Sequence, residues 1–152
     1  MGLMHFSKTK LPLYITIAGI APFVVLSVVV SMRWFSNQQA VVEILLTYAA
    51  VIISFLGGVH WGISVHHYSY SPRVANLLTI ESVAPSLVAW GVLFYPDIHI
   101  QLLVMTLLFS FMWAVESLLY SEDLIPQWFF NLRCVVTPIV VVSLYVAYFG
   151  LV

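Results

Sequence analysis

Five long apolar runs, separated by short polar segments, organise the chain. Each run is long enough to cross a hydrocarbon core of ~30 Å as a helix that rises ~1.5 Å per residue. Backbone groups in lipid must be hydrogen-bonded within their own segment, so helices are the predicted conformation. The sequence therefore predicts an all-α polytopic membrane protein, a bundle of five transmembrane helices at about residues 11–32, 40–65, 74–95, 100–119 and 128–149.

The composition supports the same prediction. Hydrophobic residues make up 62% of the 152 residues and charged residues only 7%, too few to cover the surface of a soluble domain. Short connections force consecutive helices to pack antiparallel, so residues 1–152 are expected to form a single transmembrane domain. The first run is longer than a signal-peptide core, and we expect it to be retained. The lipid bilayer is the predicted partner, and a net charge of −1 argues against nucleic acid.

The basic residues predict an orientation. Short cytoplasmic loops of membrane proteins carry an excess of lysine and arginine. Four of the five basic residues fall on one side of a five-span bundle, namely Lys8, Lys10, Arg73 and Arg133. The N-terminus is therefore expected on the cytoplasmic side and the C-terminus on the opposite, periplasmic side. Arg33 alone falls on that opposite side, where we expect a weak interfacial ion pair with Glu43.

Four ionisable residues on four different predicted helices share one depth. His60 and Arg133 each lie ~7.5 Å from the cytoplasmic end of their spans, Glu81 ~10 Å and Glu116 ~5 Å. An unpaired charge facing lipid is costly, so we expect all four side chains to point inward and to pair, with Arg133 on one carboxylate. Two interpretations stay open: a site that binds a ligand or a proton, and an ion-pair network that fixes helix order.

The end of the second span combines small residues with a histidine. Ser54, Gly58 and Gly62 recur every four residues and predict a stripe for close helix packing. Gly57, His60, Ser64 and His67 follow a 3-4-3 spacing on the other side of the helix. We therefore add Ser64 and Trp61, the neighbour of His60, to His60, Glu81, Glu116 and Arg133 as candidate ligand-binding residues.

No cofactor or catalytic group is predicted. His60, His66 and His67 could supply imidazole to a metal or a haem, but residues of one helix cannot supply opposite axial ligands to one haem. The single cysteine, Cys134, is interpreted as an apolar packing residue. The sequence contains no HExxH motif and no nucleophile elbow, so an enzyme is the least favoured of the functions considered.

Three elements of the sequence are characteristic: Gly-Gly-Val-His-Trp-Gly at 57–62, Ser-Val-Ala-Pro-Ser-Leu-Val-Ala-Trp at 82–90, and residues 124–137. In these elements the chain resembles an uncharacterised family of small proteobacterial membrane proteins with mitochondrial-type eukaryotic transmembrane relatives. The resemblance implies five spans and a multi-pass location in the bacterial inner membrane. It implies no activity.

The residues are compatible with three functions. The first is the binding or permeation of a small molecule, an ion or a proton at the buried polar site. The second is a structural or assembly subunit, in which the small-residue stripe docks a second copy or another membrane protein. The third is a membrane enzyme that uses His60 and Glu81 for acid–base chemistry.

Overall fold

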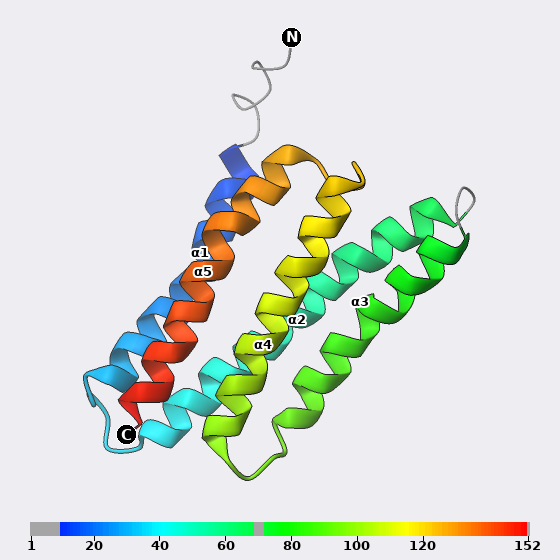
Figure 1. The fold of residues 1–152 in the computed structure, drawn as a ribbon. Coiled ribbons are helices and arrows are strands. Elements are labelled where there is room, and N and C mark those ends of the chain that lie inside the picture. Colours follow the sequence, from blue (N-terminus) through cyan, green and yellow to red (C-terminus); the bar gives the residue numbers. More distant parts are fainter. Residues whose placement is uncertain (1–9, 69–71, 152) are drawn as a thin grey trace.

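The fold is a bundle of five helices, as predicted (Figure 1). The computed structural model describes residues 10–68 and 72–151, and within these ranges no strand occurs. All five helices are long and apolar enough to cross a membrane. Lys8 lies outside the described residues. The helices are α1 Lys10–Ser31, α2 Gln38–His67, α3 Pro72–Val92, α4 Ile98–Ser121 and α5 Gln127–Gly150.

Polar residues at the helix ends explain where the helices begin. The side chain of Asn37 accepts a hydrogen bond from the amide of Ala40 at the start of α2, and Asp97 caps α4 by accepting from His99. These side chains satisfy amides that have no partner inside the helix. Pro72 is the first residue of α3, a position where the missing N–H costs nothing.

Two helices end on a residue in the left-handed conformation. Arg33 has φ 51° after α1, and Asp123 has φ 56° after α4. In each case the following amide reaches back to the last turn, from Trp34 to the carbonyl of Val29 and from Leu124 to that of Leu119. This is the Schellman arrangement, which usually uses glycine. It fixes Arg33 just beyond the end of α1.

The third helix is shorter than expected at its end. It stops at Val92, whereas the apolar run predicted residue 95. The amides of Leu93, Phe94 and Tyr95 each bond to the carbonyl three residues earlier, which is the tighter geometry of a terminal 3₁₀ turn. Hydropathy does not distinguish such a turn from a continuing helix, because the residues are equally apolar.

The helices form an asymmetric bundle in which α1 and α5 lie side by side (Figure 1). The long α2 runs diagonally across the bundle, α3 packs against α2, and α4 packs against α5 and α2. We call the end that contains the start of α1 and the α4–α5 connection the N-terminal end. The opposite end, with the α1–α2 and α3–α4 connections and the end of α5, is the C-terminal end.

The interior contains two apolar cores of unequal size. The larger core is formed by α1, α2, α4 and α5 with the end of α3, around residues such as Phe23, Leu45, Phe109 and Leu144. A smaller core at the N-terminal end gathers buried Leu78, Leu119 and Ile125 with flanking aromatic residues. The boundary between these cores is where the charged residues lie.

Candidate functional site

Four ionisable side chains from four helices meet inside the bundle at the boundary between the two cores. His60 is 0%, Glu116 0% and Arg133 5% exposed, and the Glu81 side chain is 13% exposed. They form a chain from α3 through α2 and α4 to α5, in the order Glu81, His60, Glu116, Arg133. The inward, paired arrangement expected from equal depths is the one observed. We call these four side chains the charged cluster.

Glu116 and Arg133 form the tightest contact in the cluster. The Nε of Arg133 donates to both carboxylate oxygens of Glu116, at 2.7 and 2.9 Å. Both residues are buried, so each removes the desolvation penalty that the other would carry alone. The Nη2 atom of Arg133 is buried without a hydrogen-bond partner among the described residues. The guanidinium therefore has donor capacity beyond the carboxylate that it neutralises.

His60 connects the two carboxylates. Its Nδ1 lies 2.8 Å from Glu81 Oε2 and 3.1 Å from Glu81 Oε1, which is hydrogen-bond distance. Its Nε2 lies 3.8 Å from Glu116 Oε1 and has no hydrogen-bond partner within the described chain. That separation is beyond a direct hydrogen bond, but a protonated imidazole at this distance is attracted to the carboxylate.

The formal charges of the cluster depend on His60. Two carboxylates and one guanidinium leave one excess negative charge, and a proton on the imidazole makes the sum zero. A layer surrounded by apolar cores favours the neutral sum, because net charge is costly where water is excluded. A single proton therefore decides the net charge of the cluster, and the imidazole lies between the two carboxylates that could share this proton with it.

Thr137 is a polar residue of this region that the sequence analysis did not select. It is 4% exposed, and its Oγ1 has no hydrogen-bond partner in the part of the chain that the structure describes. It follows Arg133 by one helical turn on α5, so the two residues share a face. The four-residue spacing from Arg133 could have predicted that Thr137 lies near the cluster. A threonine in an apolar helix usually bonds to its own backbone, however, so its presence in the sequence does not by itself indicate a site.

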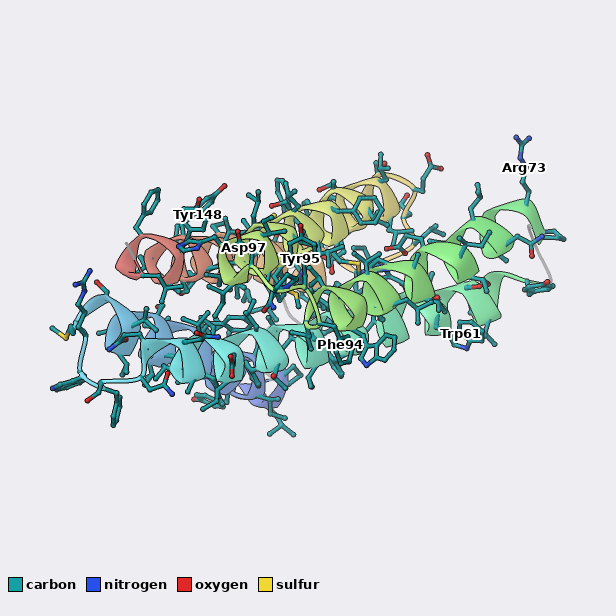
Figure 2. The ribbon with its side chains drawn as sticks, turned by 90° about the horizontal axis from the view of Figure 1, so that it is seen from below. Trp61, Arg73, Phe94, Tyr95, Asp97 and Tyr148 are labelled. Carbon is teal, nitrogen blue, oxygen red and sulfur yellow. The ribbon has the colours of Figure 1, made fainter. Side chains whose placement is uncertain are left out.

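Ser64 and Trp61 do not join the cluster. Ser64 is buried, but its hydroxyl donates to the carbonyl of Ala75 and pairs with Thr79, so it connects α2 to α3. Trp61 is 47% exposed and projects outward from α2 (Figure 2). Adjacent positions on a helix differ by ~100° in direction, so a neighbour of His60 in sequence faces elsewhere.

The face of α2 that packs is the reverse of the one predicted. Ser54, Gly58 and Gly62 are exposed, and a Cβ on either glycine would meet nothing within 4 Å. Gly57, on the side of His60, is the glycine in close contact, because a Cβ there would lie 2.2 Å from the carbonyl oxygen of Ser82 on α3. The stripe is therefore not an internal packing surface, and the histidine face is.

The described residues gather no group of three His, Cys, Asp or Glu side chains that would hold a metal ion. His66 lies on the exposed side of α2, and the His67 side chain is outside the described part of the structure. His66 is thus not brought together with His60, which is buried in the cluster.

The family model that matches the chain covers almost all of it, including the four cluster residues. It is described as "Protein of unknown function (DUF3429)" and aligns with residues 8–149. The chain belongs to the DUF3429 family. The expected membership of an uncharacterised family with eukaryotic transmembrane relatives is confirmed.

Two curated relatives of this DUF3429 member carry the name Transmembrane protein 69. The one from Xenopus tropicalis is 32% identical over 140 residues, which cover 89% of this chain and 52% of the relative. The one from Mus musculus is 29% identical over 137 residues, covering 88% and 54%. The chain thus spans about half the length of these relatives. No solved structure matches the chain. The five apolar helices and these relatives identify a multi-pass membrane protein.

Proposed function

We propose that this membrane protein binds a proton at the charged cluster and passes it between Glu81 and Glu116 through His60. The observation that carries the proposal is the fully buried imidazole held between two carboxylates, at 2.8 Å on one side and 3.8 Å on the other. Ionisable residues are expensive inside a membrane and commonly mark proton and ion pathways. Histidine is the side chain best suited to exchange a proton near neutral pH.

The close spacing of the cluster favours a proton over a larger solute. Glu81, His60, Glu116 and Arg133 contact one another at 2.7 to 3.8 Å, which leaves no room between them for a molecule. Two cavities of the described structure lie elsewhere, along α1 and α5. A proton needs no cavity, because it travels along hydrogen bonds.

The proposed transfer conserves protons and charge. Protonated Glu81 gives its proton to the unprotonated Nδ1 of His60, which leaves a carboxylate and an imidazolium. The imidazolium releases its other proton, from Nε2, to the carboxylate of Glu116. Closing the 3.8 Å separation to hydrogen-bond distance requires a small rotation of the His60 side chain. Arg133 holds Glu116 in place and stabilises its ionised form between transfers.

Glu81 is the entry point in this scheme. Its side chain is 13% exposed, while those of His60 and Glu116 are 0% exposed. Exchange with the surroundings therefore begins at the carboxylate on α3. On the orientation that the basic residues predict, this entry lies on the cytoplasmic side of the bilayer, and in a bacterium the protein belongs to the inner membrane.

Proton flux into liposomes tests the proposal. The purified full chain is reconstituted with an internal pH dye, and flux is driven by a potassium diffusion potential. We expect His60→Gln and Glu81→Gln each to reduce flux to the level of protein-free liposomes. His99→Gln is the matched control, because His99 lies at the C-terminal end beside Asp97 and outside the cluster.

A loss of flux counts only if the variants fold, so their helical content and thermal unfolding in detergent are compared with the wild type. As a second measurement, infrared difference spectra between acid and alkaline pH should show a glutamate carboxylate band that disappears in Glu81→Gln. Wild-type flux in both cluster variants, or a wild type that conducts no faster than protein-free liposomes, would contradict the proposal.

A second candidate is an assembly role, and one observation favours it. Ser54, Gly58 and Gly62 form an exposed stripe along α2, with open space above both glycines. Such stripes let a second helix approach closely in a membrane. We expect Gly58→Leu to weaken any association that uses this face. Native mass measurement in mild detergent decides: a stoichiometric foreign subunit supports assembly, and an unassociated chain rejects it.

A further inference from the structure

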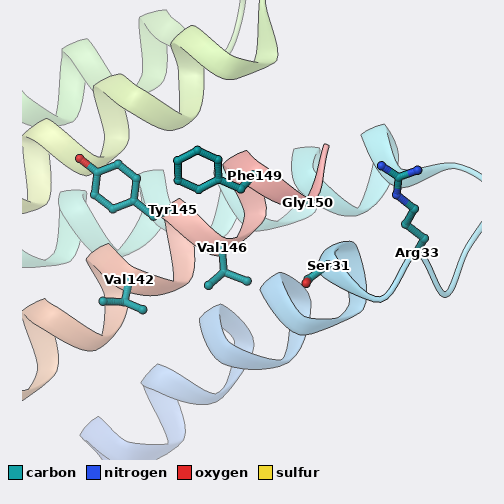
Figure 3. Close-up of a pocket in the computed structure, with 7 residues that line it drawn as sticks. All are labelled: Ser31, Arg33, Val142, Tyr145, Val146, Phe149 and Gly150. Atoms are coloured by element: carbon teal, nitrogen blue, oxygen red, sulfur yellow. The ribbon is translucent and has the colours of Figure 1, made fainter. Parts of the chain in front are cut away.

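An apolar groove runs along the outside of the bundle between α1 and α5. It consists of two adjoining cavities of about 410 and 380 Å³ that share Val142 and Val146. Figure 3 shows the first cavity, with Val142 and Val146 on the α1 side of α5 and with Ser31 and Arg33 at its outer end. Each volume lies within the ~300–1,000 Å³ that small-molecule sites occupy.

The groove has the length of one leaflet of a bilayer. It begins at Gly150 in the last turn of α5 and reaches Pro138, a distance of ~18 Å along the helix. Half of a hydrocarbon core is ~15 Å. The two helices are in close contact at the outer end, because a Cβ on Gly150 would lie 3.0 Å from the Cα of Ser31.

The inner part of the groove is suited to a hydrocarbon chain. Valine, isoleucine and proline side chains make up most of its lining. Its two serines are already satisfied, since Ser27 donates to the carbonyl of Val24 and Ser143 donates to that of Ile139. No polar group in this part therefore requires a hydrogen-bonding ligand.

The outer end of the groove carries a cation without an ion partner. Arg33 follows the last turn of α1, and in the described part of the chain no carboxylate pairs with it. The expected pair with Glu43 is not formed, because Glu43 accepts a hydrogen bond from Gln39 instead. Arg33 is the one described lysine or arginine at the C-terminal end.

We infer that this groove binds one anionic phospholipid, with an acyl chain along α1 and α5 and the phosphate on Arg33. The apolar interior and the leaflet length match an acyl chain, and the terminal guanidinium matches the phosphate. Guanidinium binds phosphate with two parallel hydrogen bonds, which adds to the attraction of charge. A transmembrane helix from a partner is the alternative occupant of this groove, and the dimer measurement below tests it.

Native mass spectrometry of the full chain, released from micelles doped with one lipid at a time, tests the inference. The probes are phosphatidylglycerol, which is anionic, and phosphatidylcholine, which is zwitterionic. We expect phosphatidylglycerol to be retained about fivefold more strongly by the wild type. Arg33→Gln should remove this preference, and Arg33→Lys should keep most of it.

Two matched controls separate the groove from general surface effects. Arg73→Gln removes the same charge from an arginine that projects outward at the N-terminal end (Figure 2), and we expect the preference to survive. Val142→Trp should block the groove and reduce retention of both lipids. Val51→Trp should not, although both valines are 59% exposed on the native surface.

Three results would overturn the inference. Equal retention of the two lipids by the wild type would reject a charged headgroup site. Displacement of the lipid by millimolar inorganic phosphate would show that the anion alone is recognised. A dimer that Val142→Trp disrupts would assign the groove to a second copy of the chain. None of these results bears on proton flux, which tests the charged cluster separately.

Discussion

At the scale of single residues, the charged cluster combines strong pairing with incomplete satisfaction. The Nε of Arg133 donates to both carboxylate oxygens of Glu116. Three nearby polar atoms are buried without partners in the described structure, namely Arg133 Nη2, His60 Nε2 and Thr137 Oγ1. Native proteins leave few buried polar atoms unpaired, and such atoms often mark functional sites. In a network that served only to fix helix order, these buried polar atoms would be expected to have hydrogen-bond partners.

The Glu116–Arg133 pair provides the first test at this scale. Arg133→Met leaves a buried carboxylate unpaired and should lower the free energy of unfolding by ~3–5 kcal/mol. Adding Glu116→Met removes the unpaired carboxylate, and it should restore most of the lost free energy of unfolding. Thermal and denaturant unfolding in a fixed detergent measures both. A double variant less stable than either single variant would contradict this account.

The same double variant separates structure from function. If it is stable but carries no proton flux, the Glu116–Arg133 pair is needed for transfer and not for folding. If flux persists at the wild-type rate, Glu116 is not the proton acceptor. Stability and flux are therefore measured on one sample of each variant.

The sequence predicted these four residues because depth in a membrane is a one-dimensional quantity. Counting residues from the end of each span placed His60, Glu81, Glu116 and Arg133 in one layer, and the cost of charge in lipid turned them inward. The direction in which a side chain points around its helix is harder to predict from sequence. Trp61 was predicted to lie in the site with His60, but it faces outward. Atom-level pairing, such as the unpartnered Thr137, needs coordinates.

At the scale of elements, Gly57 sets the distance between α2 and α3. A methyl group at this position would collide with the backbone carbonyl of Ser82, which cannot move without shifting α3. The helices thus approach closely enough for His60 on α2 to reach Glu81 on α3. The hydrogen bonds of Ser64 to the same helix lie further toward the α2–α3 connection.

Alanine at the two neighbouring glycines should have opposite effects. Gly57→Ala should lower stability by ~1–3 kcal/mol through overpacking, and it should also weaken the His60–Glu81 contact. Gly58→Ala meets open space and should be neutral or stabilising by up to ~1 kcal/mol, from helix propensity. Unfolding of the two variants under identical conditions measures the contrast. Equal effects would show that α2 and α3 are not in close contact at Gly57.

The wrong prediction for this helix has a physical reason. α2 is apolar all round, so its hydrophobic pattern gives no direction toward the core. Small residues occur on both sides, at Ser54, Gly58 and Gly62 and also at Gly57. In lipid an exposed glycine costs little, so small-residue spacing alone cannot tell an internal face from an external one. The contact of Gly57 with α3 decides it.

At the scale of the whole molecule, the arrangement of the cores gives the bundle two unlike ends. The small core and the charged cluster lie toward the N-terminal end, and the large core and the groove extend toward the C-terminal end. The number of helices and their approximate limits follow from hydropathy, except at the end of α3. The packing of α3 against α2 and the groove between α1 and α5 do not, because they depend on how each helix is rotated and tilted.

The orientation of these ends in the bilayer is the last prediction. The basic residues outside the bundle favour a cytoplasmic N-terminal end, with Arg33 alone on the other side. Ser36 in the α1–α2 connection and Ser121 at the end of α4 are both exposed. Each is replaced by cysteine in a Cys134→Ala background, so that the new cysteine is the one thiol of the given sequence. In intact cells, a membrane-impermeant maleimide should label position 36, and label position 121 only after permeabilisation. The reverse pattern would move proton entry at Glu81 to the outer side and place Arg33 in the cytoplasmic leaflet, where anionic lipids would have to be sought instead.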